Sequence, residues 1–142
     1  LTRPGDDVIV SRESHAVWHE TGAGAANAGV QFTEVGARGV FTCEEFVSRC
    51  KPRGHIIYPP TTLVEIENTH NRAGGICWDK AQLAEVTHAA HALGMVTHLD
   101  GARLWNAAVA TATRPERAIS AVAGVALPTP SAKVVTGSGV NK

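Results

Sequence analysis

Short apolar runs recur along the chain, separated by segments rich in glycine, proline and polar residues. Most of these runs carry the β-branched and aromatic residues that are enriched in strands, and the run at 31–35 alternates between polar and apolar positions. Pro59 and Pro60 separate the run at 56–58 from the run at 62–66. We therefore expect β-structure at residues 7–10, 31–35, 56–58, 62–66 and 95–99.

Helical patterns lie between these runs. Thr42 and Glu45 have the spacing of a capping box and predict a helix that ends near Lys51. Asp79 is the expected N-cap of a longer helix, which Gly94 ends. The apolar face of that longer helix is formed by Leu83, Val86, Ala90 and Leu93. Further helices are expected over residues 101–112 and 117–125.

The order of these elements predicts the fold class. Strands alternate with helices, which favours an α/β domain with a largely parallel sheet. The 142 residues are enough for one hydrophobic core. Residues 1–126 carry the alternating pattern, whereas residues 127–142 are broken by proline and glycine and contain little to bury. We expect a domain over the first range and a loose tail over the second.

The composition narrows the classes of partner. Thirteen Lys and Arg residues balance thirteen Asp and Glu residues, so no long-range field favours nucleic acid or an anionic membrane. No apolar run is long enough to span a bilayer. Three cysteines form no even set of disulfides, which favours a cytoplasmic setting. The first residues include neither Met nor a signal-peptide pattern, so we expect the chain to begin inside a larger protein.

Asp100 ends the last predicted strand and is followed three residues later by Arg103. In an open α/β sheet, ligands bind outside the carboxyl ends of the strands, so Asp100 lies where a ligand would be held. The alternative is that Asp100 caps a helix beginning at Gly101, with Arg103 as a surface partner. On spacing alone, the capping role is favoured.

Two other segments place polar side chains after a predicted strand. Residues 67–71, ENTHN, present five consecutive hydrogen-bonding side chains, which a simple connection does not require. In the segment 11–24, His15 and Glu20 lie five residues apart, with His19 between them. Histidine and carboxylate side chains bind zinc, but no partner motif completes a ligand set, so no metal is expected. The sequence also lacks the motifs of an activated serine nucleophile and of a phosphate-binding P-loop.

Four segments carry a family resemblance when they are taken in order. They are PGDDVIV at 4–10, SHAVWHETGAG at 14–24, ENTHNRAGG at 67–75 and HLDGARLWNAAVA at 98–110. Together they resemble the threonine aldolase and aromatic amino acid β-eliminating lyase family, whose members are fold type I enzymes that use pyridoxal 5′-phosphate (PLP). The resemblance implies a three-layer αβα fold with a mostly parallel sheet, like the large domain of aspartate aminotransferase, present here in incomplete form.

The resemblance also implies roles for individual residues. Asp100 matches the aspartate that bonds the pyridine nitrogen of PLP and keeps it protonated, so that the ring accepts electrons from the breaking bond. His15 matches the histidine that stacks on the ring, and a catalytic proton relay is its second implied role. Arg103 matches the arginine placed near the cofactor and the substrate carboxylate. Glu20 and His55 match positions that line the site.

The implied reaction is retro-aldol cleavage of a β-hydroxy-α-amino acid, which for threonine gives glycine and acetaldehyde. One alternative is a β-eliminating lyase that acts on another amino acid. Another is a non-catalytic remnant that only binds a partner or a subunit. The resemblance further implies a small amino acid as substrate and a homo-oligomer in the full-length form, with no nucleic-acid or membrane partner.

The chain departs from the family pattern at both ends. The family holds PLP on a lysine downstream of the aspartate, in a motif similar to S-K-G-L-G. Lys133 lies near the right distance, but the motif around it is absent, so a tail lysine is the favoured interpretation. The phosphate-binding turn and the small C-terminal domain of the family are also missing from this sequence. We therefore expect this chain alone to have little or no activity.

Overall fold

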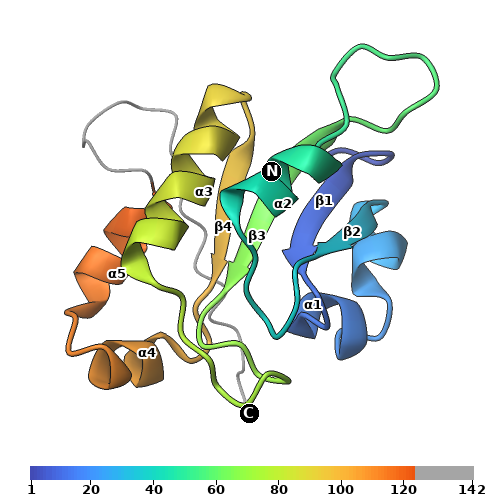
Figure 1. Cartoon of the computed structure of the whole chain (residues 1–142). Helices are drawn as coiled ribbons and strands as arrows, with labels where there is room; N and C mark the ends of the chain where they lie inside the picture. The colour runs from blue at the N-terminus through green and yellow to red at the C-terminus, as the bar shows by residue number, and fades with distance from the viewer. Residues whose placement is uncertain (124–142) are drawn as a thin grey trace.

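Four parallel strands form the centre of the structure, and their carboxyl ends share one edge of the sheet (Figure 1). The structure is a computed structural model that describes residues 1–123. The strands are β1 (Asp7–Ser11), β2 (Gln31–Val35), β3 (Thr61–Glu67) and β4 (Val96–Asp100). Their order in the sheet is β2-β1-β3-β4. The predicted α/β fold with a parallel sheet is confirmed.

Helices flank the sheet on both faces. On one face, α2 and α3 lie side by side, and α5 packs against α3 and β4 (Figure 1). The other face is covered by the short helix α1 and a π-helical turn, η1. The bounds of these elements are α1 (His15–Trp18), η1 (Gly24–Ala28), α2 (Cys43–Arg49), α3 (Lys80–Ala92), α4 (Leu104–Ala110) and α5 (Pro115–Val122). The three layers of the αβα fold are therefore present.

The two faces of the sheet bury unequal amounts of apolar surface. The face beneath α2, α3 and α5 holds the main core, in which aromatic residues pack on strand residues such as Ile9 and Ile66. Phe41 meets Trp78 edge to face there, with ring centroids 4.8 Å apart. The other face holds a smaller buried cluster, Val8, Val10, Val30 and Leu63. This second face carries a cavity.

The two predicted N-caps are confirmed. Thr42 Oγ1 accepts a hydrogen bond from the backbone N–H of Glu45 at 3.1 Å, and the Glu45 carboxylate accepts one from the backbone N–H of Thr42 at 2.8 Å. Asp79 Oδ1 accepts from the backbone N–H groups of Ala81 and Gln82. Each cap satisfies N–H groups that have no partner inside the helix, which fixes where the helix begins.

Other predicted elements differ from the structure. Residues 56–58 form an exposed loop and no strand, because the two prolines that follow cannot extend a ladder, and β3 starts only at Thr61. The helix predicted from residue 101 begins at Leu104, after a turn. Leu93 is exposed, because α3 has already ended at Ala92. The predicted tail at 127–142 and Lys133 lie outside the described residues.

A buried carboxylate joins three strands near their amino ends. Asp7, the first residue of β1, is fully buried. Its Oδ1 accepts hydrogen bonds from Thr33 Oγ1 at 2.7 Å and from Lys51 Nζ at 2.8 Å, and its Oδ2 accepts one from Thr61 Oγ1 at 2.8 Å. These partners come from β2, from the segment after α2 and from β3. Asp7 therefore fixes the sheet at the edge opposite the carboxyl ends of the strands.

Candidate active site

The carboxyl ends of β1, β3 and β4 bring three polar segments together. The segments are residues 11–20, 67–75 and 100–103, and each of them follows or completes a strand. Figure 1 shows these strand ends at the same edge of the sheet. In sheets of this kind the crevice outside that edge is where ligands bind. The polar segments identified in the sequence therefore meet in the place where a site is expected.

Glu67, the last residue of β3, connects all three segments. It is 1% exposed. Its Oε2 accepts a hydrogen bond from the backbone N–H of His15 at 2.9 Å, and its Oε1 accepts one from the backbone N–H of Asn71 at 2.8 Å. Oε1 also lies 3.7 Å from Nη1 of Arg103. A buried carboxylate needs such partners to offset its lost hydration, and here the partners are the site segments themselves.

His70 completes the buried group around Glu67. Its Nδ1 accepts a hydrogen bond from the backbone N–H of Ala73 at 3.2 Å, so a neutral ring carries its proton on Nε2. That nitrogen lies 3.4 Å from Glu67 Oε2, an ion-pair distance without hydrogen-bond geometry. Gly39 packs on the ring so closely that a Cβ there would lie 2.5 Å from His70 Cγ. The side chain of His70 therefore shapes the loop after β3.

His15, the first residue of α1, is held at two points. Its backbone is fixed by Glu67, and its Nε2 lies 3.2 Å from Glu20 Oε1. A carboxylate beside Nε2 favours the tautomer that carries its proton there. The other ring nitrogen, Nδ1, is buried and has no hydrogen-bond partner within residues 1–123. His15 thus has one nitrogen oriented by Glu20 and a second that can accept a proton.

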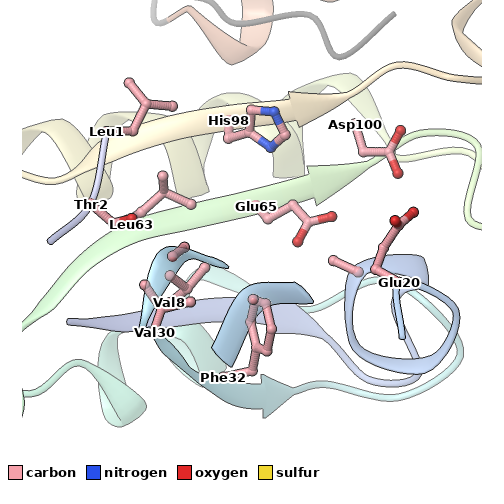
Figure 2. A pocket seen from close by; sticks show the side chains of 13 residues that line it. Leu1, Thr2, Val8, Glu20, Val30, Phe32, Leu63, Glu65, His98 and Asp100 are labelled. Carbon is pink, nitrogen blue, oxygen red and sulfur yellow. The ribbon is translucent and has the colours of Figure 1, made fainter. Parts of the chain in front are cut away.

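Asp100 ends β4 and lines the cavity on the less covered face of the sheet (Figure 2). Its Oδ1 accepts a hydrogen bond from the backbone N–H of Ala102 at 3.1 Å. Asp100 is also the direct neighbour of Glu67 in the pairing of β3 with β4. The two interpretations of Asp100 are therefore compatible, because one oxygen holds the turn while the side chain still lies on the cavity wall.

The cavity has a volume of about 430 Å³ and combines an apolar wall with an acidic end. The wall includes Val8, Val30, Phe32 and Leu63. Glu20, Glu65 and Asp100 also line the cavity, and Figure 2 shows these three carboxyl groups gathered at one end of it. Burial, reinforced by the charge of Asp100, raises the pKa of Glu65 to about 8. The acidic end therefore contains a carboxyl group that keeps a proton near neutral pH.

The structure brings four of the five predicted site residues to one edge of the sheet. Arg103 lies beside the Glu67 carboxylate that also holds the backbone of His15. Glu20 lies beside the ring of His15 and lines the same cavity as Asp100. The four residues placed together are His15, Glu20, Asp100 and Arg103.

His55 is the predicted site residue that the structure does not bring into this group. It lies in the exposed loop before β3, at the amino end of the sheet, where its ring stacks on Tyr58 with centroids 4.3 Å apart. Figure 1 shows this loop, between α2 and β3, at the opposite end of the sheet from the site. Within this chain His55 therefore does not line the cavity.

Two buried carboxyl residues of the site were not among the predicted site residues. Glu65 and Glu67 alternate with Val64 and Ile66 near the end of β3. Successive side chains of a strand point to opposite faces, so this alternation places both acids on one face of a buried strand. Acidic residues are seldom buried without a reason, and two on the same face are the signal that could have indicated them.

The described residues include two lysines, and neither lines this cavity. Lys51 pairs with Asp7 at the amino end of the sheet. Lys80 begins α3 and lines a separate cavity that also includes Asn68. Over residues 1–123 no group of three or more His, Cys, Asp or Glu residues is arranged to hold a metal ion. Across the same range no helix has the length and apolar character to cross a membrane.

The sheet, its two helical layers and the position of the site define a fold shared with PLP-dependent enzymes of fold type I. Threonine aldolase from Leishmania major superposes with a TM-score of 0.73 at 24% sequence identity, over 85% of this chain and 35% of that one. N-Succinyldiaminopimelate aminotransferase from Mycobacterium tuberculosis gives a TM-score of 0.53 at 21% identity, over 71% and 25%. These likenesses establish the fold.

Sequence similarity establishes the family. The sequence model of the Beta-eliminating lyase family matches residues 1–129, and the chain belongs to that family. Low-specificity L-threonine aldolase 1 of Arabidopsis thaliana is 30% identical over 94% of this chain and 40% of that protein. The low specificity L-threonine aldolase of Escherichia coli strain K12 is 30% identical over 75% of this chain and 31% of that protein. The chain thus spans well under half the length of these relatives.

Proposed function

We propose that this chain forms part of the site of a PLP-dependent lyase that cleaves a β-hydroxy-α-amino acid, with threonine giving glycine and acetaldehyde. The observation that carries the proposal is Asp100, a carboxylate at the end of a strand and on the wall of a cavity. Glu20, which lies beside the ring of His15, lines the same cavity. Family membership and the threonine aldolase relatives support the same reaction class.

The residues present fit the ring of PLP. Asp100 supplies a carboxylate for a protonated ring nitrogen, and the apolar cavity wall suits the faces of an aromatic ring. The buried Nδ1 of His15 has no partner within the described residues, which is the state expected of a group that contacts a ligand. When bound, PLP supplies a ring that accepts electrons from the bond being broken.

The side chains around this position have separate tasks in the proposal. His15 would contact the ring and would accept the proton of the substrate β-hydroxyl group, while Glu20 keeps its imidazole in one orientation. Arg103 receives the substrate carboxylate, since its guanidinium carries several donors and is only loosely engaged by Glu67 at 3.7 Å. Glu67 holds the backbone of His15 in place and lies beside Arg103.

The first test measures the binding of PLP to the whole chain by the change in absorbance. We expect a saturable spectral change that Asp100→Asn abolishes. Asp79→Asn is the matched control, because Asp79 caps α3, outside the cavity, and asparagine caps a helix as well as aspartate. The absence of saturable PLP binding, or equal binding by both variants, would overturn the proposal.

Borohydride reduction and peptide mass mapping then locate any covalent attachment. An adduct confined to Lys133 would show that this chain carries its own anchor for PLP. No specific adduct, together with saturable binding, would place the anchor outside these residues. Incubation with threonine and with other amino acids separates the reactions, because glycine and acetaldehyde report aldol cleavage whereas pyruvate and ammonia report β-elimination.

A further inference from the structure

Glu65 is a buried acid on the wall of the cavity, directly opposite His98 in the pairing of β3 with β4. It is 5% exposed, and Figure 2 shows its side chain pointing into the cavity beside Asp100. The position is imposed by the strand, because Glu65 and Asp100 lie on the same face of neighbouring parallel strands, one pleat apart. A carboxyl group placed in this way is poorly solvated, and burial disfavours its charged form.

The groups that surround Glu65 add to this effect. Those on the described residues are Asp100 and His98 on β4, Glu67 on β3, Glu20 after α1, and the amino terminus at Leu1, which Figure 2 shows at the other end of the cavity. β1, β2 and η1 contribute apolar or small side chains to the cavity. Burial first, then the charges of Asp100, Glu67 and Glu20, raise the pKa of Glu65 to about 8.

We propose that Glu65 is a positioning residue for Asp100: it holds the proton of this carboxyl pair and leaves Asp100 to carry the negative charge that receives a cationic ring nitrogen. Neighbouring carboxyl groups commonly divide their roles in this way, because two adjacent charges repel one another. The identity of the cation rests on the proposed function, whereas the proton on Glu65 is a property of the free chain.

The arrangement predicts an exchange of charge when a cation binds. A positive ring nitrogen beside Asp100 stabilises the ionised form of Glu65, which then releases its proton to solvent. Binding and proton release are linked, so the affinity for the cation rises as the pH increases and Glu65 ionises. With glutamine at position 65 this contribution is lost, while a neutral side chain of the same size is retained.

The first experiment follows the free protein by NMR. The ¹³C signal of the Glu65 carboxyl group, assigned with Glu65→Gln, is titrated in the whole chain from about pH 5 to about pH 10. We expect a midpoint near 8, which Asp100→Asn lowers without returning it to 4.5, because burial is the larger cause. Glu44→Gln, on the exposed surface of α2, should leave it unchanged. A midpoint in the ordinary range of glutamate, or one that Asp100→Asn does not move, would overturn the inference.

The second experiment measures PLP affinity against pH for the natural chain and for Glu65→Gln. Dividing the affinity of the natural chain by that of Glu65→Gln removes the effect of the titration of PLP itself. We expect this ratio to rise by up to about tenfold between about pH 7 and about pH 9. A constant ratio would refute the exchange of charge. Failure of the natural chain to bind PLP at every pH would instead count against the proposed function, and the NMR titration would still decide where the proton resides.

Discussion

Glu67 joins segments that are 52 residues apart in the sequence, through its hydrogen bond with the backbone of His15. At the same time it holds the loop that begins only four residues later, at Asn71. Both carboxylate oxygens are therefore used to position backbone, and the side chain of Arg103 lies beside one of them. Glu67 thus positions the backbone of two site segments and lies beside the third.

Replacing Glu67 by glutamine should destabilise the chain and loosen the site. An amide has one acceptor oxygen, so its NH₂ group would face either the N–H of His15 or that of Asn71. A buried donor left without a partner costs about 1–3 kcal/mol, which urea unfolding would detect. Glu13→Gln is the control, because the Glu13 side chain is 45% exposed and its replacement should change stability by less than about 0.5 kcal/mol. Equal effects of the two changes would contradict the role assigned to Glu67.

Glu65 should make the stability of the chain depend on pH. Its pKa is about 8 when folded and 4.5 as a free side chain, so below about pH 4.5 both states bind the proton. As the pH rises from there to about 8, the unfolded chain loses the proton first, and the native state loses up to about 1.4 kcal/mol per pH unit relative to it. The Glu65→Gln variant does not lose stability in this way, because glutamine does not titrate. Urea unfolding at a series of pH values should therefore show the variant gaining stability relative to the natural chain between about pH 4.5 and about pH 8. A constant difference would exclude the linkage.

At the scale of elements, carboxylates hold the sheet together at both ends of its strands. The buried Glu67 and the half-buried Asp100 organise the carboxyl ends, and the buried Asp7 organises the amino ends. Asp7 draws its partners from β2, from β3 and from Lys51. The alignment of the strands is thus specified by polar contacts as well as by the apolar core between sheet and helices.

Replacing Lys51 by methionine should test that fastening. The change keeps an unbranched side chain only one atom shorter but leaves a fully buried Asp7 without its cationic partner. Breaking a buried pair on one side costs about 3–5 kcal/mol, and the partial exposure of Lys51 should reduce this to about 2–3 kcal/mol. The double variant Asp7→Asn with Lys51→Met should recover part of the loss in urea unfolding. A single variant as stable as the natural chain would show that the hydroxyl donors suffice.

Features made by residues close together in the sequence were predicted more accurately than features that depend on distant residues. The caps at Thr42 and Asp79 were predictable because a cap is made within four residues of the chain. Residues 56–58 have strand-like composition, but a strand also needs a partner, and the prolines after them prevent pairing. Propensity alone therefore over-predicted structure there.

The site was predicted unevenly for a related reason. His15, Asp100 and Arg103 belong to recognisable segments, and the fold brings those segments together. The importance of Glu65 and Glu67 lies in what faces them across the sheet, which the local sequence does not specify. His55 shows the converse, since its match to a family position near the site did not place it beside the others in this chain.

At the scale of the whole molecule, the loop before β3 carries three consecutive exposed apolar side chains. Ile56 is 98% exposed and Ile57 76% exposed, and Tyr58 beside them is also exposed. Consecutive apolar side chains at a loop tip add nothing to the core, and such surface usually marks a contact with another molecule. We expect this loop to take part in the homo-oligomer that the family resemblance implies.

Changing Ile56 and Ile57 together to serine should therefore lower the mass measured in solution by light scattering after size-exclusion chromatography. Stability should stay the same, because both side chains are already exposed. Val109→Ser is the matched control, since Val109 is an exposed apolar residue on α4, away from that loop. A mass that falls with the control and not with the loop variant would place the contact elsewhere.

The three tryptophans occupy very different surroundings, and this gives the chain its own optical reporters. Trp78 is 4% exposed and contacts Phe41 in the main core, whereas Trp18 is 54% exposed and Trp105 71% exposed. Trp18 also lies under the guanidinium of Arg72, 4.5 Å from the ring centroid, in the segment that carries His15. Emission shielded from acrylamide therefore comes from the core, and quenchable emission reports in part on the surroundings of the site. Unfolding of the core and movement at the site can be followed separately in one cuvette, without an added label.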